Sequence, residues 1–376
     1  MPSIRRYPPA RREPVTAGDA AEAPLGSSPE ESAHGRRSWR ALGHAEHHLR
    51  RSALKLVGYV VAAYLVLKLI PALEQALTSL EHASWQLVLV AVAVETLSEM
   101  GFVVSWQAVV DPDNLLGREG RGRRMDTRVA WAQLGGGTVV PGGSWGGLGV
   151  GAWMLHHFGM PVKLVAQREL TLSFLNTAVD ALALVLFGLL LASGILSGGR
   201  DLLLTLLPAA LAAAALAAAV LVARRAARRA GREPVKHARI AVVIATLSEA
   251  VQSTQRLLLH PRGYRALLGA VAYLVLDVLV LWIAFLAVHA DPVPGFGVIV
   301  VAYIIGALGG SLPLPGGVGT IGGMAGVFIL FGVAHDPAIS AVLLYQAIGL
   351  LVPLVGGGLA YAVIRRNLSR SAPLLA

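Results

Sequence analysis

The sequence has 376 residues, of which 55% are hydrophobic and only 14% are charged. Soluble domains carry roughly a quarter charged residues, so this composition excludes an ordinary soluble protein and indicates an integral membrane protein. The formal net charge of +10 is what basic cytoplasmic loops give to a membrane protein, and we do not predict nucleic-acid binding. Because the chain has no cysteine, disulfides, thiolate metal sites and cysteine nucleophiles are excluded.

Residues 1–50 differ from the rest of the chain. They are rich in Pro, Ser, Ala, Glu and Arg, and they contain no apolar run of the kind that a secretory signal has. Such a composition predicts a disordered region on the cytoplasmic side of a membrane.

After residue 50, apolar segments alternate with short polar connections as far as residue 366. We predict one membrane domain over 51–366 and a cytoplasmic tail over 367–376. Several of the apolar runs reach the roughly 20 residues that cross the hydrocarbon core of a bilayer. The segments cover about residues 54–73, 85–110, 129–158, 162–194, 201–223, 266–289, 295–333 and 338–364.

Lysine and arginine are distributed unevenly among the connections. Residues 36–55, 118–128 and 224–239 contain six, five and seven of them, whereas 71–84, 290–295 and 334–337 contain none. By the positive-inside rule the basic connections are cytoplasmic and the others external, which puts both chain termini in the cytoplasm.

Two segments begin and end on the same side under this assignment. Segment 129–158 enters and leaves from the cytoplasm and segment 295–333 from the exterior, and each contains Pro-Gly-Gly near its middle. Non-helical backbone is tolerated at membrane depth only where protein or water satisfies its amides. We therefore predict an all-α polytopic fold with about six transmembrane helices plus two re-entrant hairpins. Segment 240–261 is interrupted by Gln252, Gln255 and Arg256, and it is predicted as a cytoplasmic, partly interfacial helix.

The two hairpin segments resemble each other. A shift of 174 residues superimposes Gly135-Gly136 on Gly309-Gly310 and Pro141-Gly142-Gly143 on Pro315-Gly316-Gly317, and a Phe-Gly pair follows in each copy. Since the copies are predicted to enter from opposite faces, they would form an inverted repeat. Many secondary transporters are built in this way, with their substrate sites at the repeat interface.

The tips of the hairpins are candidate binding sites. A glycine-rich turn followed by a helix N-terminus exposes backbone N–H groups that attract anions such as phosphate or carboxylate. Alternatively, the glycines only allow helices to pack closely. The predicted substrate-binding residues are Pro141, Gly142, Gly143, Ser144, Pro315, Gly316, Gly317, Gly319 and Thr320.

Four acidic residues lie within predicted spans. Glu95 and Glu99 are four residues apart and so share a helix face, whereas Asp180 and Asp277 are each near the middle of a segment. Ionisable groups at membrane depth usually mark pathways or paired sites. Two carboxylates on one face repel, so at least one should hold a proton near neutral pH. Three interpretations stay open: structural pairing with Gln133, Asn176, Arg168 or a helix end, which is the expectation for most such groups; proton coupling, for which the four residues are candidates; and cation binding.

Four stretches resemble one known family. The sequences "AYIIGALGGSLPLPGGVGTIGG" (302–323) and "AVLLYQAIGLLVPLVGG" (341–357) resemble the transmembrane region of the lysylphosphatidylglycerol synthase/flippase family. The stretches "VVPGGSWGGLGVGAWMLHHFGM" (139–160) and "SWQAVV" (105–110) resemble motifs of its first half. The resemblance covers roughly residues 55–366. It implies an eight-segment, lipid-flippase-like domain related to proteins that move aminoacylated or other modified lipids between leaflets.

The chain departs from the pattern of this family at three places. Many relatives have Glu where this chain has Gly322 or Gly323, a Tyr-Arg pair where it has Tyr345-Gln346, and Arg where it has Gly151 and Ala152. The sequence also lacks the soluble aminoacyl-transfer domain of the synthases. We therefore expect no lipid synthesis and no enzymatic activity.

The sequence thus predicts a lipid flippase of the plasma membrane, acting on an anionic or modified phospholipid or a lipid-linked molecule, without cofactor or metal. A secondary transporter of a small anionic solute and a non-transporting scaffold or accessory protein are the alternatives. A lateral opening to lipid favours the flippase, and a closed aqueous vestibule favours the solute transporter. A sealed interior with every carboxylate paired favours the scaffold.

Overall fold

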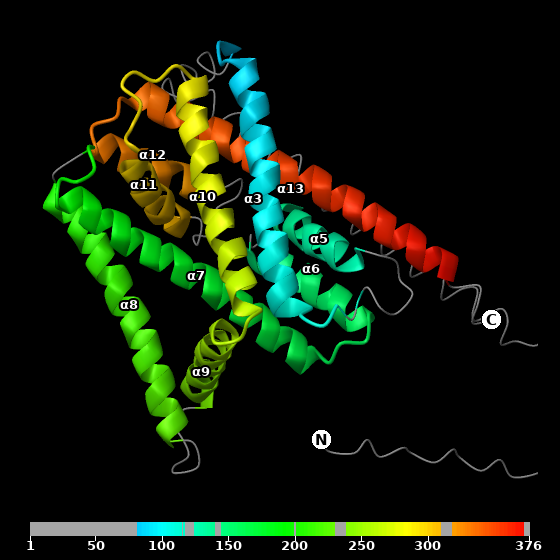
Figure 1. Ribbon diagram of the computed structural model, residues 1–376. Coiled ribbons are helices and arrows are strands. Elements are labelled where there is room, and N and C mark those ends of the chain that lie inside the picture. The colour runs from blue at the N-terminus through cyan, green and yellow to red at the C-terminus, as the bar shows by residue number, and fades with distance from the viewer. Residues whose placement is uncertain are drawn as a thin grey trace, which may run out of the picture. The chain divides into compact units, whose positions relative to one another are not determined.

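The computed structural model describes residues 81–114, 116, 124–139, 144–198, 201–229, 238–309 and 318–371, all within the compact unit Ala62–Ala376 (Figure 1). These residues form helices joined by short turns, and they include no strand. The prediction of an all-α polytopic membrane protein is therefore confirmed. The predicted region 1–50 and the segment 54–73 lie outside the described residues.

Five described helices are long and apolar enough to cross a membrane. They are α3 (Trp85–Val110), α7 (Val162–Ala192), α8 (Leu202–Arg229), α10 (Gly263–Ala287) and α13 (His335–Ser371). Large apolar side chains line their outer faces; on α7, for example, Leu182, Leu186 and Leu189 are each more than half exposed. Their spacing makes one stripe along the helix. Exposing such an apolar stripe to water would be unfavourable, whereas a helix that contacts lipid can expose it.

Each glycine-rich segment forms two short helices that pack against each other. The first pair is α5 (Met125–Val139) and α6 (Ser144–His157), and the second is α11 (Phe296–Gly309) and α12 (Val318–Leu330). These helices have 13 to 15 residues, fewer than a transmembrane span needs. Their lengths suit the predicted hairpins, whose re-entry into a membrane stays a prediction.

Helices α3 and α10 run side by side through the middle of the described helices (Figure 1). They approach closely because glycines lie at the crossing. A Cβ atom on Gly101 would lie 2.8 Å from the backbone nitrogen of Tyr273, and one on Gly269 would lie 2.6 Å from that of Ser105. The Ser98 hydroxyl donates a hydrogen bond of 2.9 Å to the carbonyl of Tyr273. Small residues allow this kind of backbone approach between membrane helices.

The helices on the two sides of this central pair correspond in order. Shifting α3, α5, α6 and α7 by 174 residues brings their first residues to within four residues of the starts of α10, α11, α12 and α13. The packing corresponds as well, because α5 packs against α13 whereas α11 packs against α7. Figure 1 shows the two short-helix pairs on opposite sides of α3 and α10. Their inverted orientation stays a prediction, since it is defined by the two faces of a membrane.

The repeated Phe-Gly pair ends α6 and α12 in the same way. Gly159 and Gly332 have φ angles of +92° and +87°, the left-handed region that glycine adopts without strain. The residue after each glycine donates a backbone hydrogen bond across the last turn, from Met160 to Leu155 at 3.1 Å and from Val333 to Phe328 at 3.0 Å. The repeat seen in the sequence therefore includes a shared helix-ending motif.

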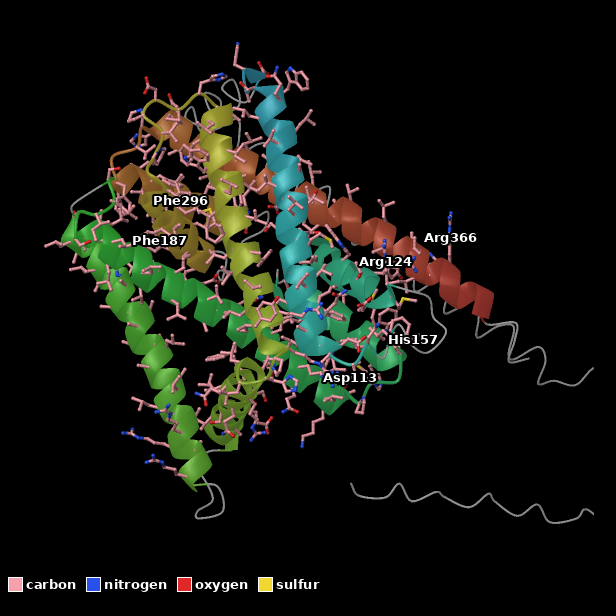
Figure 2. All side chains as sticks on the ribbon, viewed as in Figure 1. Asp113, Arg124, His157, Phe187, Phe296 and Arg366 are labelled. Atoms are coloured by element: carbon pink, nitrogen blue, oxygen red, sulfur yellow. The ribbon has the colours of Figure 1, made fainter. Side chains whose placement is uncertain are left out.

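Lysine and arginine side chains gather at one end of the described helices, which we call the basic end (Figure 2). Helices α3, α8 and α13 end here, and helices α5, α7 and α10 begin here. The described connections 193–198, 288–295 and 331–334, at the opposite end, contain no Lys or Arg. This asymmetry is the one that the positive-inside rule uses. A cytoplasmic location of the basic end stays a prediction.

Helix α9 (Ala238–Leu258) is not among the five candidate spans. It packs against α7, α8 and α10 through one face, which includes the buried Val251 and Thr254, and it exposes Arg256. One apolar face and one polar face are typical of a helix at the membrane surface. This agrees with the prediction that segment 240–261 does not span.

Candidate functional site

Three carboxyl groups are buried where α3 and α10 pack together. Glu95 and Glu99 of α3 are only 4% and 3% exposed, and Asp277 of α10 is 5% exposed. Each glutamate lies within electrostatic range of Asp277. The sequence prediction that Glu95 and Glu99 share one face is confirmed, and that face points into the protein.

Tyrosines surround Asp277 from two other helices. The Tyr303 hydroxyl on α11 donates a hydrogen bond of 2.6 Å to Asp277 Oδ2. The rings of Tyr303 and Tyr345, the latter on α13, meet edge to face with centroids 6.1 Å apart. Tyr273 lies one turn before Asp277 on α10 and packs against Phe102. Helices from both halves of the chain therefore converge on this aspartate.

Helix α7 adds a further acidic residue. Asp180 lies in its middle, within electrostatic range of Asp277, and Asn176 is one turn earlier. The structure thus brings together all four acidic residues singled out in the sequence. We call the group the carboxyl–tyrosine cluster: Glu95, Glu99, Asp180, Asp277, Tyr273, Tyr303 and Tyr345.

The cluster has more acceptors than donors. One buried carboxyl oxygen in each of Glu95, Glu99 and Asp277 has no hydrogen-bond partner among the described residues, and neither has the amide oxygen of Asn176. Described Lys and Arg residues lie at the basic end, away from the middle of the helices. A buried carboxylate without a partner costs several kcal/mol. The cluster is therefore suited to exchange protons or to hold a cationic group.

Two of the proposed pairing partners are engaged elsewhere. The amide of Gln133 on α5 accepts a hydrogen bond of 2.8 Å from the Trp106 indole and donates one of 2.9 Å to Glu169 on α7. Arg168 donates to the carbonyl of Val110 at 2.7 Å. The bonds that the described residues make therefore give no support to a pairing of Gln133 or Arg168 with the four acidic residues.

The predicted glycine tips are only partly described. Pro141, Gly142, Gly143, Pro315, Gly316 and Gly317 lie outside the described residues. Ser144 begins α6, and Gly319 and Thr320 lie in the first turn of α12. A Cβ atom on Gly309 would overlap the backbone of Gly319, so at this point the glycines serve close packing of α11 and α12. Anion binding at the tips stays a prediction.

Metal binding finds no support in the described part of the chain. No three His, Asp or Glu residues there are grouped closely enough to ligate a metal ion. The predicted absence of cofactors stays an expectation.

Several members of these polar groups were missed in the sequence. Tyr303 and Tyr345 lie 42 residues apart, within long apolar helices, and only folding brings their rings together. Glu169 is 5% exposed, yet it follows Arg168 near a predicted basic connection, where it resembles a solvated residue. An acidic residue about two helical turns inside a predicted span is the signal that could have found it.

Comparison with known families supplies the broader context. The family described as the lysylphosphatidylglycerol synthase TM region matches residues 55–357, which is most of the chain. The chain belongs to this family. The lysylphosphatidylglycerol synthase TM region is a membrane domain associated with lipid metabolism and transport, so the predicted family and the multi-pass membrane location are confirmed. No curated protein matches the chain closely enough to serve as a named relative.

Within this family, one departure of the chain has a visible physical basis. The resemblance described above implies an Arg where this chain has Gly151 and Ala152. A Cβ atom on Gly151 would overlap the side chain of Gln133, which occupies this space and binds Glu169. At Gly322, by contrast, a Cβ atom would meet nothing within 4 Å. A side chain at 151 would therefore displace the Gln133 amide, whereas position 322 has room for a side chain.

Proposed function

We propose that the chain moves a lipid between the two leaflets of a membrane and that the carboxyl–tyrosine cluster couples this movement to protons. Membership of the lysylphosphatidylglycerol synthase TM family supports a role in lipid transport. The observation that carries the coupling is that helices of both halves bring acidic groups to one buried place, with no basic partner among the described residues. No covalent bond of the lipid changes in this proposal, so the protein acts as a transporter and not as an enzyme.

The cluster offers a way to link protonation to helix packing. Asp277 is bonded to Tyr303 of α11 and faces the glutamates of α3. When a proton leaves, repulsion between neighbouring carboxylates increases. That repulsion acts where α3, α10, α11 and α13 meet, which is the interface between the halves. A proton gradient would then favour one of two arrangements, as alternating access requires.

The proposed substrate is an anionic or modified phospholipid or a lipid-linked molecule. Its headgroup would bind at the predicted Pro-Gly-Gly tips, because a glycine-rich turn before a helix N-terminus attracts anions. Its acyl chains would stay in the bilayer beside the short-helix pairs.

The first prediction concerns leaflet exchange by purified protein in liposomes. Labelled anionic, zwitterionic and aminoacylated lipids are followed with and without a pH gradient. We expect exchange of at least one lipid, accelerated by the gradient. Asp277→Asn should reduce the gradient-driven rate by about tenfold or more, because an amide cannot exchange the proton. Replacing Gly316 and Gly317 by leucine should stop exchange by filling the tip.

The matched control is Glu249→Gln, which removes one carboxylate from the exposed face of α9 and should change the rate less than about twofold. Absence of exchange for every lipid would contradict the proposed transport. Exchange that persists unchanged in folded Asp277→Asn would contradict the coupling role alone.

A further inference from the structure

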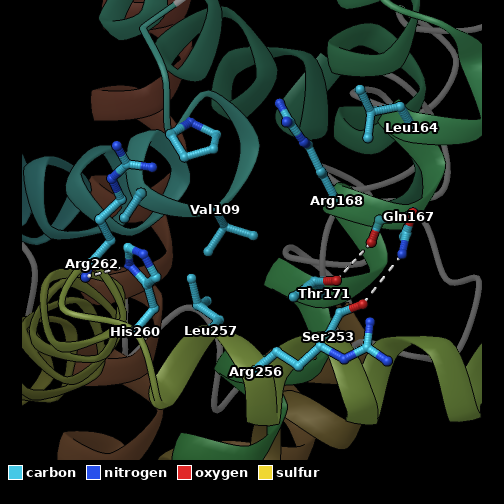
Figure 3. A pocket seen from close by; sticks show the side chains of 12 residues that line it. Val109, Leu164, Gln167, Arg168, Thr171, Ser253, Arg256, Leu257, His260 and Arg262 are labelled. Carbon is cyan, nitrogen blue, oxygen red and sulfur yellow. Dashed lines mark hydrogen bonds between the residues drawn. The ribbon is translucent and has the colours of Figure 1, made fainter. Parts of the chain in front are cut away.

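A pocket of about 360 Å³ lies at the basic end, apart from the carboxyl–tyrosine cluster. Its walls come from the end of α3, the start of α7, the end of α9 and the turn into α10 (Figure 3). A cavity of this volume can hold a phosphate group with part of a glycerol backbone. The proposed transport does not use it.

Three arginines from three different elements border the pocket. Arg168 comes from α7, Arg256 from α9 and Arg262 from the turn before α10. Figure 3 shows them around the rim, with Val109 and Leu257 between them. Arginine is the side chain best shaped to bind phosphate oxygens, because its planar group offers five N–H donors.

These arginines keep donors available. Arg168 uses one guanidinium nitrogen on the Val110 carbonyl. Arg262 pairs with Asp113 at 3.3 Å, but both side chains are about half exposed, so the pair is weak and easily exchanged. Arg256 makes no hydrogen bond or ion pair with any described residue. Three arginines thus line one pocket, and among the described residues only Arg262 is paired with a carboxylate.

The remaining walls suit a lipid better than a fully polar ligand. Gln167 and Ser253 bond to each other at 3.3 Å across the pocket, between α7 and α9. Apolar side chains of Val109, Leu164 and Leu257 complete the lining. The pocket therefore combines phosphate-binding groups with an apolar wall, at the level where candidate spans begin and end.

We propose that this pocket binds a phosphate group, carried by a phospholipid headgroup or by a soluble phosphate ester. Basic residues at helix ends often serve only to set topology. Here they border a cavity between helices and beside an amphipathic helix, which is the arrangement that holds anionic lipid headgroups. The inference does not depend on translocation, and its test measures binding alone.

The test is native mass spectrometry of the full chain in detergent, titrated with dioleoylphosphatidylglycerol. Dioleoylglycerol, which lacks phosphate, is the reference ligand. We expect the phospholipid to bind and Arg256→Gln to weaken this binding about tenfold or more, the lower end of what one charge-assisted hydrogen bond contributes. Arg256→Lys should restore part of the affinity. Arg265→Gln removes the same charge from an exposed position outside the pocket and should change the affinity less than about twofold.

Two competition measurements identify which kind of molecule carries the bound phosphate. Displacement of the phospholipid by millimolar glycerol 3-phosphate or inorganic phosphate would assign the pocket to a soluble ester. Retention of the phospholipid would assign it to a lipid. Equal effects of Arg256→Gln and Arg265→Gln, or equal binding of dioleoylglycerol, would overturn the proposal, since neither outcome fits a phosphate site in this pocket.

Discussion

Gln133 joins two buried groups with opposite requirements. The Trp106 indole needs an acceptor and the Glu169 carboxyl needs a donor, and one side-chain amide provides both, at 2.8 and 2.9 Å. Leucine has nearly the same size and neither function. Gln133→Leu would therefore leave an indole N–H and a carboxyl group unpaired between α3, α5 and α7.

We expect Gln133→Leu to lower the free energy of unfolding by about 2–5 kcal/mol, the cost of two unsatisfied buried groups. Thermal unfolding in detergent, followed by tryptophan fluorescence, measures the change. Gln107→Leu is the control, because Gln107 is only partly buried and loses a single bond of 3.0 Å to Thr127. Equal loss of stability in the two variants would show that the network is no more important than a bond near the surface.

The sequence predicted individual acidic residues better than their surroundings. Glu95 and Glu99 are recognisable because helical spacing places them on one face, and an apolar helix makes any carboxylate conspicuous. The partners are not recognisable in this way. Tyr303 reaches Asp277 only because α11 docks beside α10, and no local pattern contains that contact.

At the scale of helices, neighbouring glycines have different roles. Gly357 and Gly358 are adjacent on α13. A Cβ atom on Gly357 would lie 2.6 Å from both Gly135 Cα and the Trp131 carbonyl oxygen on α5, whereas one on Gly358 would meet nothing within 4 Å. Gly357 therefore sets how closely α5 approaches α13, and Gly358 faces away from that contact.

Gly357→Ala should destabilise the protein by about 1–3 kcal/mol, because the backbones at the crossing must separate. Gly358→Ala should be neutral or stabilising by up to about 1 kcal/mol, since alanine favours helix and nothing obstructs its methyl group. Thermal unfolding of the two variants side by side tests this difference. A similar change in both would mean that close packing does not hold α5 against α13.

Helix boundaries were well predicted where apolar length alone determines them. The segment 85–110 is α3 as observed, and 162–194 differs from α7 only at its end. Segments 129–158 and 295–333 were predicted as hairpins from their glycines and from the presence or absence of Lys and Arg beside them, and each contains two short helices. Close contacts such as Gly101 with Gly269 could not be predicted, because glycine in a membrane helix does not indicate which partner it faces.

On the scale of the whole chain, the correspondence of the two halves is the main structural result. Helix order, helix starts, the Phe-Gly endings and the exchanged contacts of α5 with α13 and α11 with α7 all agree. A chance likeness of glycine-rich sequences would not reproduce contacts between helices. The two halves meet at α3 and α10, where the carboxyl–tyrosine cluster lies, so a relative movement of the halves would change the surroundings of its acidic groups.

The last prediction tests whether the halves are inverted across a membrane. The chain has no cysteine, so a single cysteine can be introduced at Ser144 or Thr320, near the starts of α6 and α12. If the two short-helix pairs enter the membrane from opposite faces, each is reached by solvent from its own face. A small membrane-impermeant thiol reagent should then label Ser144→Cys only from the face of the basic end. It should label Thr320→Cys only from the other face. Arg124→Cys and Asp291→Cys, at exposed positions of the two ends, identify the faces in sealed vesicles. Labelling of Ser144→Cys and Thr320→Cys from one common face would contradict the inverted repeat, and the proposed alternating access would lose its structural basis.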